Sequence, residues 1–476
     1  NNWGELIHPF IPEWLAPKDE AAIRWFYEGA PAAVDIPLSA WLRPLISWSI
    51  FAAGLYGTMI ATAVILRRQW VQHERLAYPL VQVPLALTES TTGDSVVPPF
   101  FRNPLMWAGF AVPFLVSSLA ALRSYHHLIP APDLVATVSL FDQALNLIFR
   151  LSFPMVGFTY LINLDIAFSL WFFNLLANGL RAVLGTIGFA STENLGIYGV
   201  ANQPLLAHQG MGAMAVLVAF GLWLSRRHLA TVVSAALRPG ARDANNEIVS
   251  YRTAVLMWGS GMTITTAWLW LSGLPFWLAL VVNLVAQAIF VGLTRIVVEG
   301  GVAAAVAPMI ASSAVVSAVG TSQIGHPGMV ALAFTYVWSA DIRTFVLASC
   351  AHGLKLSQYL GRNPKPLFWC MILALLLGLV GSVWMILQQA YAEGGINLNS
   401  WFFGGGTRAP FIYITSQLSQ PTGPDWSGWV HTGLGAAVMV MLMRLSHHYS
   451  WWPLHPLGYP IGAVWLMDQL WFSIFV

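Results

Sequence analysis

Apolar runs long enough to cross a lipid bilayer recur along almost the whole chain. A membrane-spanning helix needs about 20 mostly apolar residues, because the hydrocarbon core is about 30 Å thick. Runs close to this length occur at 45–66, 104–123, 208–225, 253–272, 275–297, 302–320, 326–350, 367–390, 429–446 and 459–476. Within lipid, a helix pairs its own backbone groups along each segment. The sequence therefore predicts an all-α, polytopic transmembrane helical bundle.

Composition excludes several other classes of protein. Of the 476 residues, 57% are hydrophobic and 9% are charged, whereas soluble proteins average roughly 25% charged residues. The net charge of +2 is too small to indicate binding to nucleic acid. The two cysteines, Cys350 and Cys370, lie in apolar surroundings, which favours packing over a disulfide framework or a thiolate metal site.

Basic residues gather in short clusters between the apolar runs, and these clusters report topology. Cytoplasmic loops carry an excess of Lys and Arg. We therefore expect a cytoplasmic location for Arg67, Arg68, Arg75, Arg102, Arg226, Arg227, Arg238, Arg242, Arg252, Lys355, Arg362, Lys365 and Arg444. Residues 1–44 then form an external N-terminal segment. The chain starts at Asn1 and stops within an apolar run, so we expect that neither biological end is present.

Three segments do not fit simple crossings. Residues 76–90 contain Pro79 and Pro84 and are flanked by arginines of like expected location, which predicts a re-entrant segment entering from the cytoplasmic side. Residues 151–206 must begin and end outside, so we expect a broken helix or hairpin there. The glycine- and proline-rich residues 391–428 are predicted to form an external loop long enough to act as a lid.

Two transmembrane halves are predicted, at 45–273 and 274–476. A loose period relates 45–66 to 275–297 and 208–225 to 429–446. Twofold repeats are common in secondary transporters. The repeat leaves open whether 302–320 spans the membrane or re-enters.

Ionisable residues within the apolar runs are candidates for function, because a charged side chain at membrane depth costs about 2.5 kcal/mol or more. Asp165 follows Asn163 between two apolar stretches. In one interpretation it is a proton or cation site exposed by a broken helix. In the other it is a carboxylate at the start of a helix near the surface.

Arg295 and Glu299 end one apolar run, just before an Ala-, Gly- and Ser-rich run that Pro308 breaks. Residues four apart share a helix face, so this pair is expected to form a salt bridge. The salt bridge is either a gate beside a substrate-lining broken helix or an ordinary pair at the cytoplasmic end.

Two further polar segments have alternative interpretations. Asp341 and Arg343 lie near mid-membrane if their helix is continuous, or in an amphipathic surface helix if Ser339 or Asp341 caps a new one. Glu193 and Asn194, in the glycine-rich linker 185–206 with Gln203, either line an outer vestibule or belong to a plain polar loop.

Histidines raise the question of a metal site. His126, His127, His447, His448 and His455 show neither the HxxHH nor the HExxH spacing of membrane metal sites. We expect no metal, no cofactor and no enzymatic activity.

Three stretches carry a family resemblance: Arg67 to Pro79 with Leu85–Leu87, Phe334 to Lys355, and Trp451 to Gly458. On these stretches the chain resembles the oligopeptide transporter superfamily, in particular its divergent bacterial branch. The resemblance implies a helical secondary transporter of two related halves in a bacterial inner (plasma) membrane. It also implies proton-coupled movement of oligopeptides, related small solutes or metal chelates.

The sequence-based hypothesis is a proton symporter whose central cavity is lined by 76–90 and 300–320. Tyr78 and Gln82, with Glu193 and Asn194, are the predicted substrate contacts. The predicted proton-coupling residues are Asp165, Glu299, Arg295, Asp341 and Arg343. The expected partners are the lipid bilayer, a small-molecule or peptide substrate and protons, with a homo-oligomer left open. Two alternatives are a histidine-dependent metal or haem protein in the membrane and a non-transporting scaffold subunit.

Overall fold

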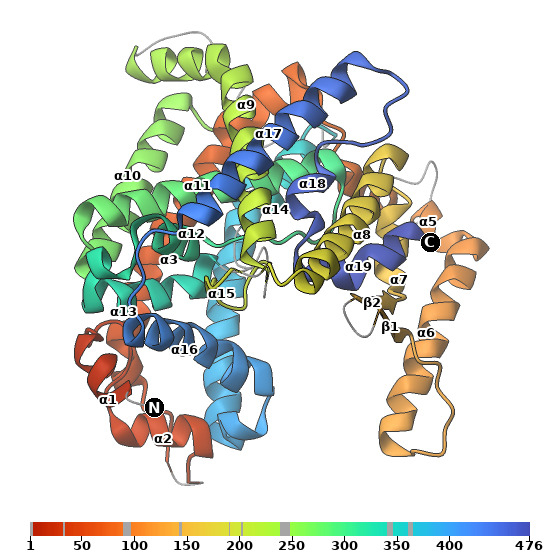
Figure 1. Cartoon of the computed structure of the whole chain (residues 1–476). Coiled ribbons are helices and arrows are strands. Elements are labelled where there is room, and N and C mark those ends of the chain that lie inside the picture. Colours follow the sequence, from red (N-terminus) through yellow and green to blue (C-terminus); the bar gives the residue numbers. More distant parts are fainter. Residues whose placement is uncertain are drawn as a thin grey trace. The chain divides into compact units, whose positions relative to one another are not determined.

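The computed structural model describes residues 3–31, 34–88, 97–141, 145–189, 191–200, 203–238, 248–339, 346–359 and 365–476. Helices form nearly all of the regular structure in these residues (Figure 1). Seven helices are long and apolar enough to cross a membrane: Leu38–His73, Pro104–Tyr125, Leu164–Thr186, Pro204–Leu237, Phe276–Gly300, Lys365–Glu393 and Trp426–His448. The protein is therefore an integral membrane protein with an all-α helical bundle, as the sequence predicts.

The described residues fall into two compact units that alternate along the chain. The first unit contains residues 1–75, 191–294 and 306–437, and the second contains residues 76–190, 295–305 and 438–476. Helices α11 (Phe276–Gly300) and α17 (Trp426–His448) have residues in both units. The division into an N-terminal and a C-terminal half stays a prediction.

The first unit packs long helices against several short ones. Helix α3 (Leu38–Arg68) packs along α10 (Tyr251–Leu271), and α10 also contacts α9 (Pro204–Leu237). At the α3–α10 crossing, a Cβ atom on Gly261 would lie 2.4 Å from the Gly54 carbonyl oxygen, so glycine sets this close approach. The remaining elements of the unit are α1 (Trp3–Leu6), η1 (His8–Phe10), α2 (Glu20–Glu28), η2 (Gln69–His73), α12 (Ala311–Val319), α13 (Thr321–Ser339), α14 (Leu347–Leu356), α15 (Lys365–Glu393), η6 (Gly395–Asn397), η7 (Trp401–Gly405) and α16 (Gly406–Ser419).

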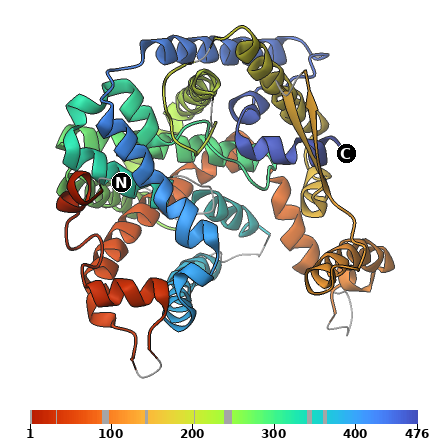
Figure 2. The ribbon, with the colours of Figure 1, turned by 60° about the horizontal axis from the view of Figure 1, so that its bottom comes forward.

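The second unit is built around α8 (Leu164–Thr186), which packs on α18 (Gly458–Gly462) and α19 (Trp465–Phe475). Asn163 caps α8 by accepting a hydrogen bond from the Asp165 backbone N–H. The other helices are η3 (Pro79–Val81), α4 (Gln82–Thr88), α5 (Pro99–Arg102), α6 (Pro104–Tyr125) and α7 (Phe153–Thr159). This unit also holds one antiparallel hairpin, β1 (Val135–Leu140) with β2 (Leu145–Arg150) (Figure 2).

Broken helices occur at two of the predicted places. Residues 301–310 are not helical, and α12 covers only nine residues, about 13.5 Å at 1.5 Å per residue. The helical part of the run 302–320 is therefore too short to cross a bilayer. The run is not helical around Pro308, as predicted. Residues 151–186 form a broken helix, α7 followed by α8.

The short apolar segment after α3 contains only ten helical residues, Pro79–Thr88. Its Tyr78 adopts a left-handed backbone conformation with φ 48° and donates its N–H to the Val298 carbonyl. The segment thus lies against the end of α11. The cavity that it was expected to line together with 300–320 stays a prediction. The re-entrant direction of the segment stays a prediction as well.

Three expectations about secondary structure were wrong. The predicted span at 459–476 is two short helices, because residues 463–464 separate α18 from α19. The predicted loop at 391–428 is largely helical, since it contains α16, which packs on α13. No strand was predicted, yet residues 135–140 and 145–150 form paired strands, in which apolar and polar side chains alternate too weakly to mark them in an apolar chain.

Candidate functional site

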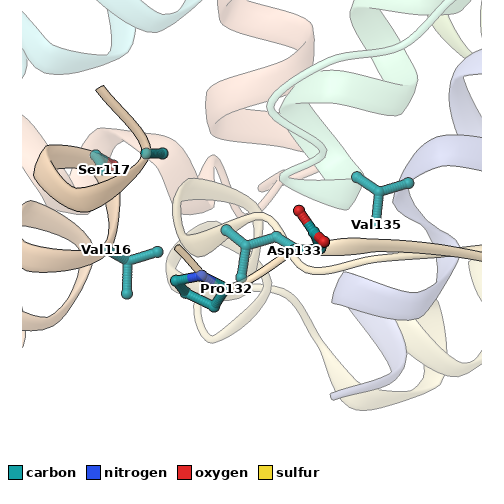
Figure 3. Close-up of a pocket in the computed structure, with 7 residues that line it drawn as sticks. Val116, Ser117, Pro132, Asp133 and Val135 are labelled. Atoms are coloured by element: carbon teal, nitrogen blue, oxygen red, sulfur yellow. The ribbon is translucent and has the colours of Figure 1, made fainter. Parts of the chain in front are cut away.

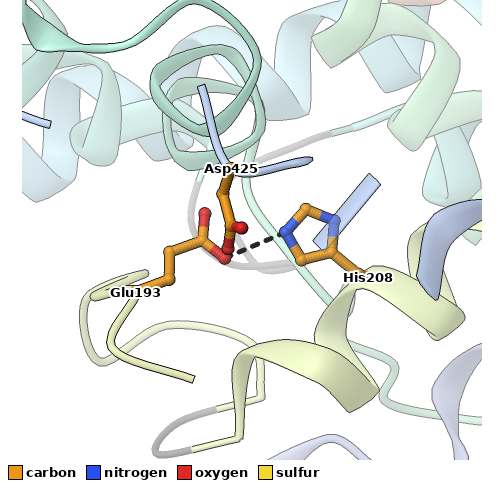
Figure 4. Close-up of side chains that lie close together, drawn as sticks. All are labelled: Glu193, His208 and Asp425. Carbon is orange, nitrogen blue, oxygen red and sulfur yellow. Dashed lines mark hydrogen bonds and ion pairs between the residues drawn. The ribbon is translucent and has the colours of Figure 1, made fainter. Parts of the chain in front are cut away.

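Two carboxylates and an imidazole converge within the first unit. One ligand atom from each of Glu193, His208 and Asp425 lies within 4.8 Å of the other two. Figure 4 shows the three side chains pointing toward one another from different parts of the chain. Glu193 comes from the segment 191–200, His208 from the first turns of α9, and Asp425 from the residue before α17.

His208 is held at the buried end of a membrane-length helix. Pro204 starts α9, where its missing N–H costs no hydrogen bond, and His208 follows one turn later. The residue is 1% exposed, and its ring lies edge-on to Trp429, with centroids 6.0 Å apart. Burying an ionisable group so deeply in an apolar helix costs free energy unless the group is paired. Such residues in membrane helices usually serve a function.

Helix α17 approaches α9 closely enough to enclose the imidazole. A Cβ atom on Gly428 would lie 2.2 Å from His208 Nε2, so only glycine leaves room for the ring. Farther along the same contact, a Cβ on Gly212 or on Gly435 would overlap the backbone of the facing helix. Small residues permit such contacts between membrane helices.

The neighbouring hydrogen-bond donors and acceptors determine which nitrogen of the His208 ring carries a hydrogen. The Thr432 hydroxyl lies 3.2 Å from the Gly428 carbonyl oxygen, which only accepts, and 2.8 Å from His208 Nδ1. Its single hydrogen goes to the carbonyl, so Nδ1–H donates to Thr432. This assignment follows from the hydrogen-bond network. It leaves Nε2 as the atom that faces the carboxylates.

Nε2 lies 3.0 Å from Glu193 Oε2 and 3.3 Å from Ser317 Oγ. A lone pair on a neutral Nε2 would repel a carboxylate oxygen at that distance. The contact is attractive only if a hydrogen or a cation lies between the two atoms. The Glu193 side chain is 11% exposed, which limits screening by water.

Asp425 adds a second carboxylate and caps α17. Its Oδ1 accepts a hydrogen bond from the Gly428 backbone N–H at 3.2 Å, and its own N–H donates to the Ser317 carbonyl at 3.0 Å. A carboxylate is stabilised at a helix N-terminus by the free N–H groups and the helix dipole. Asp425 is therefore held by the same α12 residue that contacts the imidazole.

The loop that carries Glu193 is anchored by α12 and α16. Ser313 Oγ donates to the Leu195 carbonyl at 3.0 Å, and Gln417 Nε2 donates to the Asn194 carbonyl at 3.1 Å. The Asn194 side chain accepts from the Gly196 N–H, which is a turn-stabilising role. The structure thus brings predicted residue Glu193 into the cluster and leaves Asn194 exposed beside it.

A group of tyrosines lies next to this loop. Tyr336 lies edge-on to Tyr198 and tilted against Tyr413, with ring centroids 5.4 and 6.2 Å apart. Tyr336 and Tyr413 are buried, and a phenol hydroxyl can both donate and accept a hydrogen bond.

The other predicted site residues lie elsewhere. Arg295 Nε and Glu299 Oε2 are 3.1 Å apart on α11, which confirms the predicted salt bridge; its role as a gate stays a prediction. Asp165 is exposed in the first turn of α8. Tyr78 is 2% exposed and Gln82 is exposed. Asp341 and Arg343 fall outside the described residues.

Sequence reasoning missed His208, Asp425 and Ser317. His208 opens the apolar run 208–225, so the rule that singles out Asp165, an ionisable residue at membrane depth, applied to it as well. Asp425 gave no such signal, since it lies in a polar segment. The histidines considered for metal binding do not appear in a ligand set like this one within the described part of the chain.

A pocket in the second unit lacks the converging ionisable side chains of the Glu193 cluster among its described lining residues. It has a volume of about 320 Å³ and lies between α6 and the start of β1 (Figure 3). It is lined by Val116, Ser117, Ala120, Pro132, Asp133, Leu134 and Val135. Its single carboxylate, Asp133, forms an exposed salt bridge with Arg123 at 3.3 Å. We therefore place the candidate site at Glu193, His208 and Asp425.

Comparison with known proteins gives the family and no activity. No curated protein and no solved structure matches the chain. One family model matches all of residues 1–476, and it describes a family of unknown function. The chain therefore belongs to that family, DUF6785.

Proposed function

We propose that the protein is a secondary active transporter in which Glu193 and His208 carry the coupled proton. The observation that carries the proposal is the 3.0 Å contact between Glu193 Oε2 and His208 Nε2, which requires a hydrogen or a cation between the two atoms. The pair lies at the buried end of α9, a helix of membrane-spanning length. A buried group that gains and loses a proton within a membrane is the part a proton-coupled transporter needs.

Broken helices beside the pair support transport over a purely structural role. Residues 301–310 and the break at Gly320 flank α12, which supplies Ser317 to the site. Secondary transporters bind substrate and ions where discontinuous helices expose free backbone groups. Non-helical backbone at membrane depth is tolerated where it is buried in protein or lines a water-filled cavity.

Substrate binding is proposed at the tyrosine group next to the Glu193 loop. Tyr198, Tyr336 and Tyr413 offer apolar faces and hydroxyls, which suit a small polar solute with apolar parts. The resemblance to the oligopeptide transporter superfamily favours oligopeptides, related small solutes or metal chelates. Protonation of Glu193 next to this group would then change substrate affinity.

This proposal moves the coupling role away from the residues favoured by sequence. Glu299 is neutralised by Arg295 in a salt bridge, and the Asp165 side chain is exposed at a helix start. Glu193 faces the imidazole Nε2 at 3.0 Å, a contact that requires a shared hydrogen or a cation, so it replaces both in the scheme.

The test is proton-driven uptake by the purified full chain in proteoliposomes. A pH-sensitive dye in the lumen would report proton entry when a mixture of di- and tripeptides is added under an imposed pH gradient. We expect proton entry with wild-type protein, and its loss in Glu193→Gln and His208→Gln. Asp165→Asn is the control and should keep it. Peptide-independent dye signals, or full coupling in the Glu193→Gln/His208→Gln double variant, would contradict the proposal.

A further inference from the structure

We propose that Glu193, His208 and Asp425 bind one divalent transition-metal ion, which takes the place of the hydrogen between Glu193 and His208. Metal binding goes beyond transport, because an ion can bind this site whether or not the protein moves a substrate. The proposal rests on the three converging ligand atoms and on the buried Nε2, which faces an acceptor oxygen.

The spacing of the ligand atoms suits a single ion. Two ligands on one metal ion at bond lengths of about 2.0–2.2 Å lie roughly 3 Å apart, and Nε2 and Oε2 are 3.0 Å apart. All three ligand atoms lie within 4.8 Å of one another.

The hydrogen bond made by the other ring nitrogen of His208 is also typical of a metal-binding histidine. A ligating imidazole usually donates its second ring N–H to a neighbouring acceptor, which fixes the tautomer and the ring orientation. In this site Nδ1–H donates to Thr432 Oγ1 at 2.8 Å, so Nε2 presents its lone pair to the site. The ring is further held by Gly428 and Trp429. The ligand is therefore pre-oriented.

Charge favours a divalent ion over a monovalent one. Two carboxylates beside a neutral imidazole carry a charge of about −2 in a poorly hydrated place, where like charges repel strongly. A divalent cation neutralises both. One nitrogen and two oxygen ligands favour Zn²⁺, Mn²⁺ or Fe²⁺ over Mg²⁺ and Ca²⁺, which prefer oxygen alone. Ser317 Oγ, 3.3 Å from Nε2, is a further oxygen beside the site.

Metal binding can be measured directly on the purified full chain in detergent. After chelator treatment, the protein is titrated with Zn²⁺ by calorimetry and with Co²⁺ by visible absorption, which reports ligand geometry. We expect one ion per chain, and binding that weakens as the pH falls, because the ligands must lose protons. Loss of a ligand should weaken binding about 10-fold or more.

The variants are Glu193→Gln, His208→Gln and Asp425→Asn. Asparagine is also a good helix cap, so the last variant removes a ligand charge while keeping α17 capped. The matched controls are His447→Gln and Glu393→Gln, which replace exposed residues of the same types. Wild-type affinity in both controls, with weaker binding in the three ligand variants, supports the site. Absence of binding in the wild type, or unchanged binding in both Glu193→Gln and His208→Gln, overturns it.

This result is independent of the transport test. Metal binding is measured without a gradient or a substrate, and proton entry is measured in metal-free liposomes. Proton coupling without metal binding would overturn only the metal inference. Metal binding without proton coupling would overturn only the proposed transport mechanism.

Discussion

The two units each hold a buried cluster of charged side chains, and the clusters differ in how their charges are balanced. In the second unit, Asp468 accepts hydrogen bonds from Asn174 and Asn178 on one oxygen and from Arg181 on the other. Arg181 also donates to the Ala463 carbonyl. One negative charge meets one positive charge, so the charges balance, although Arg181 Nε has no hydrogen-bond partner.

The Glu193 cluster has no such balance. Two carboxylates face one imidazole, and the net charge depends on which protons or cations are bound. Burial alone therefore does not separate a structural ion pair from a functional one. The useful criterion is whether the charges balance without an added proton or ion.

The largest expected effect is the loss of Arg181. Arg181→Leu leaves the half-buried Asp468 carboxylate without its cation, and breaking a fully buried pair typically costs about 3–5 kcal/mol, which is the upper bound for this pair. Arg181 and Asp468 are each 20% exposed, so water replaces the lost partner poorly. Thermal unfolding in detergent, followed by circular dichroism, should show a large drop in midpoint temperature.

The control is the double variant Arg181→Leu/Asp468→Leu. Removing both charges abolishes the unpaired carboxylate, so the double variant should be more stable than Arg181→Leu alone. If Arg181→Leu left the midpoint unchanged, the view of this cluster as a structural ion pair would be wrong.

The next largest loss of stability is expected when a side chain fills the space beside the His208 imidazole. In Gly428→Ala the added methyl would overlap His208 Nε2, and overpacking typically costs about 1–3 kcal/mol. Gly433 lies on the same helix with open space around it, so Gly433→Ala should be neutral or stabilising by up to about 1 kcal/mol. Thermal unfolding of the two variants would compare them. Equal effects would show that α17 does not enclose the ring.

Removing the charge of Glu193 should change stability less than Arg181→Leu or Gly428→Ala does. Glu193→Gln keeps the size of the side chain and relieves repulsion between two carboxylates, so we expect a change within about 1 kcal/mol of wild type. Proton coupling should nevertheless be lost. A destabilisation as large as that of Arg181→Leu would make the Glu193–His208 pair a structural ion pair and break the contrast between the units.

The sequence predicted the long helices well because bilayer thickness imposes their length. Pro308 marked one break, and the expected location of the charged loops predicted the break before α8. The sequence also predicted the Arg295–Glu299 pair, since both residues lie on one helix. Contacts between distant segments could not be predicted. His208 and Asp425 meet only because α9 packs on α17, and spacing along the chain does not show which helices are neighbours. The strands at 135–140 and 145–150 were missed because their alternation is weak.

The smallest effect concerns His455, a histidine of the second unit. Burial lowers its pKa, a shift that the charge of Asp165 partly offsets, and its Nδ1 accepts a hydrogen bond from the Leu457 N–H. The folded protein therefore prefers neutral His455. Below the ordinary histidine pKa of about 6.5 the unfolded chain binds a proton more readily, so stability should fall with pH by no more than about 1.4 kcal/mol per pH unit. Unfolding midpoints of wild type and His455→Gln between pH 8 and pH 5 would measure this contribution as the difference in slope. Identical slopes would mean that His455 is protonated equally in the folded and unfolded states, and its burial would then have no effect on the pH dependence of stability.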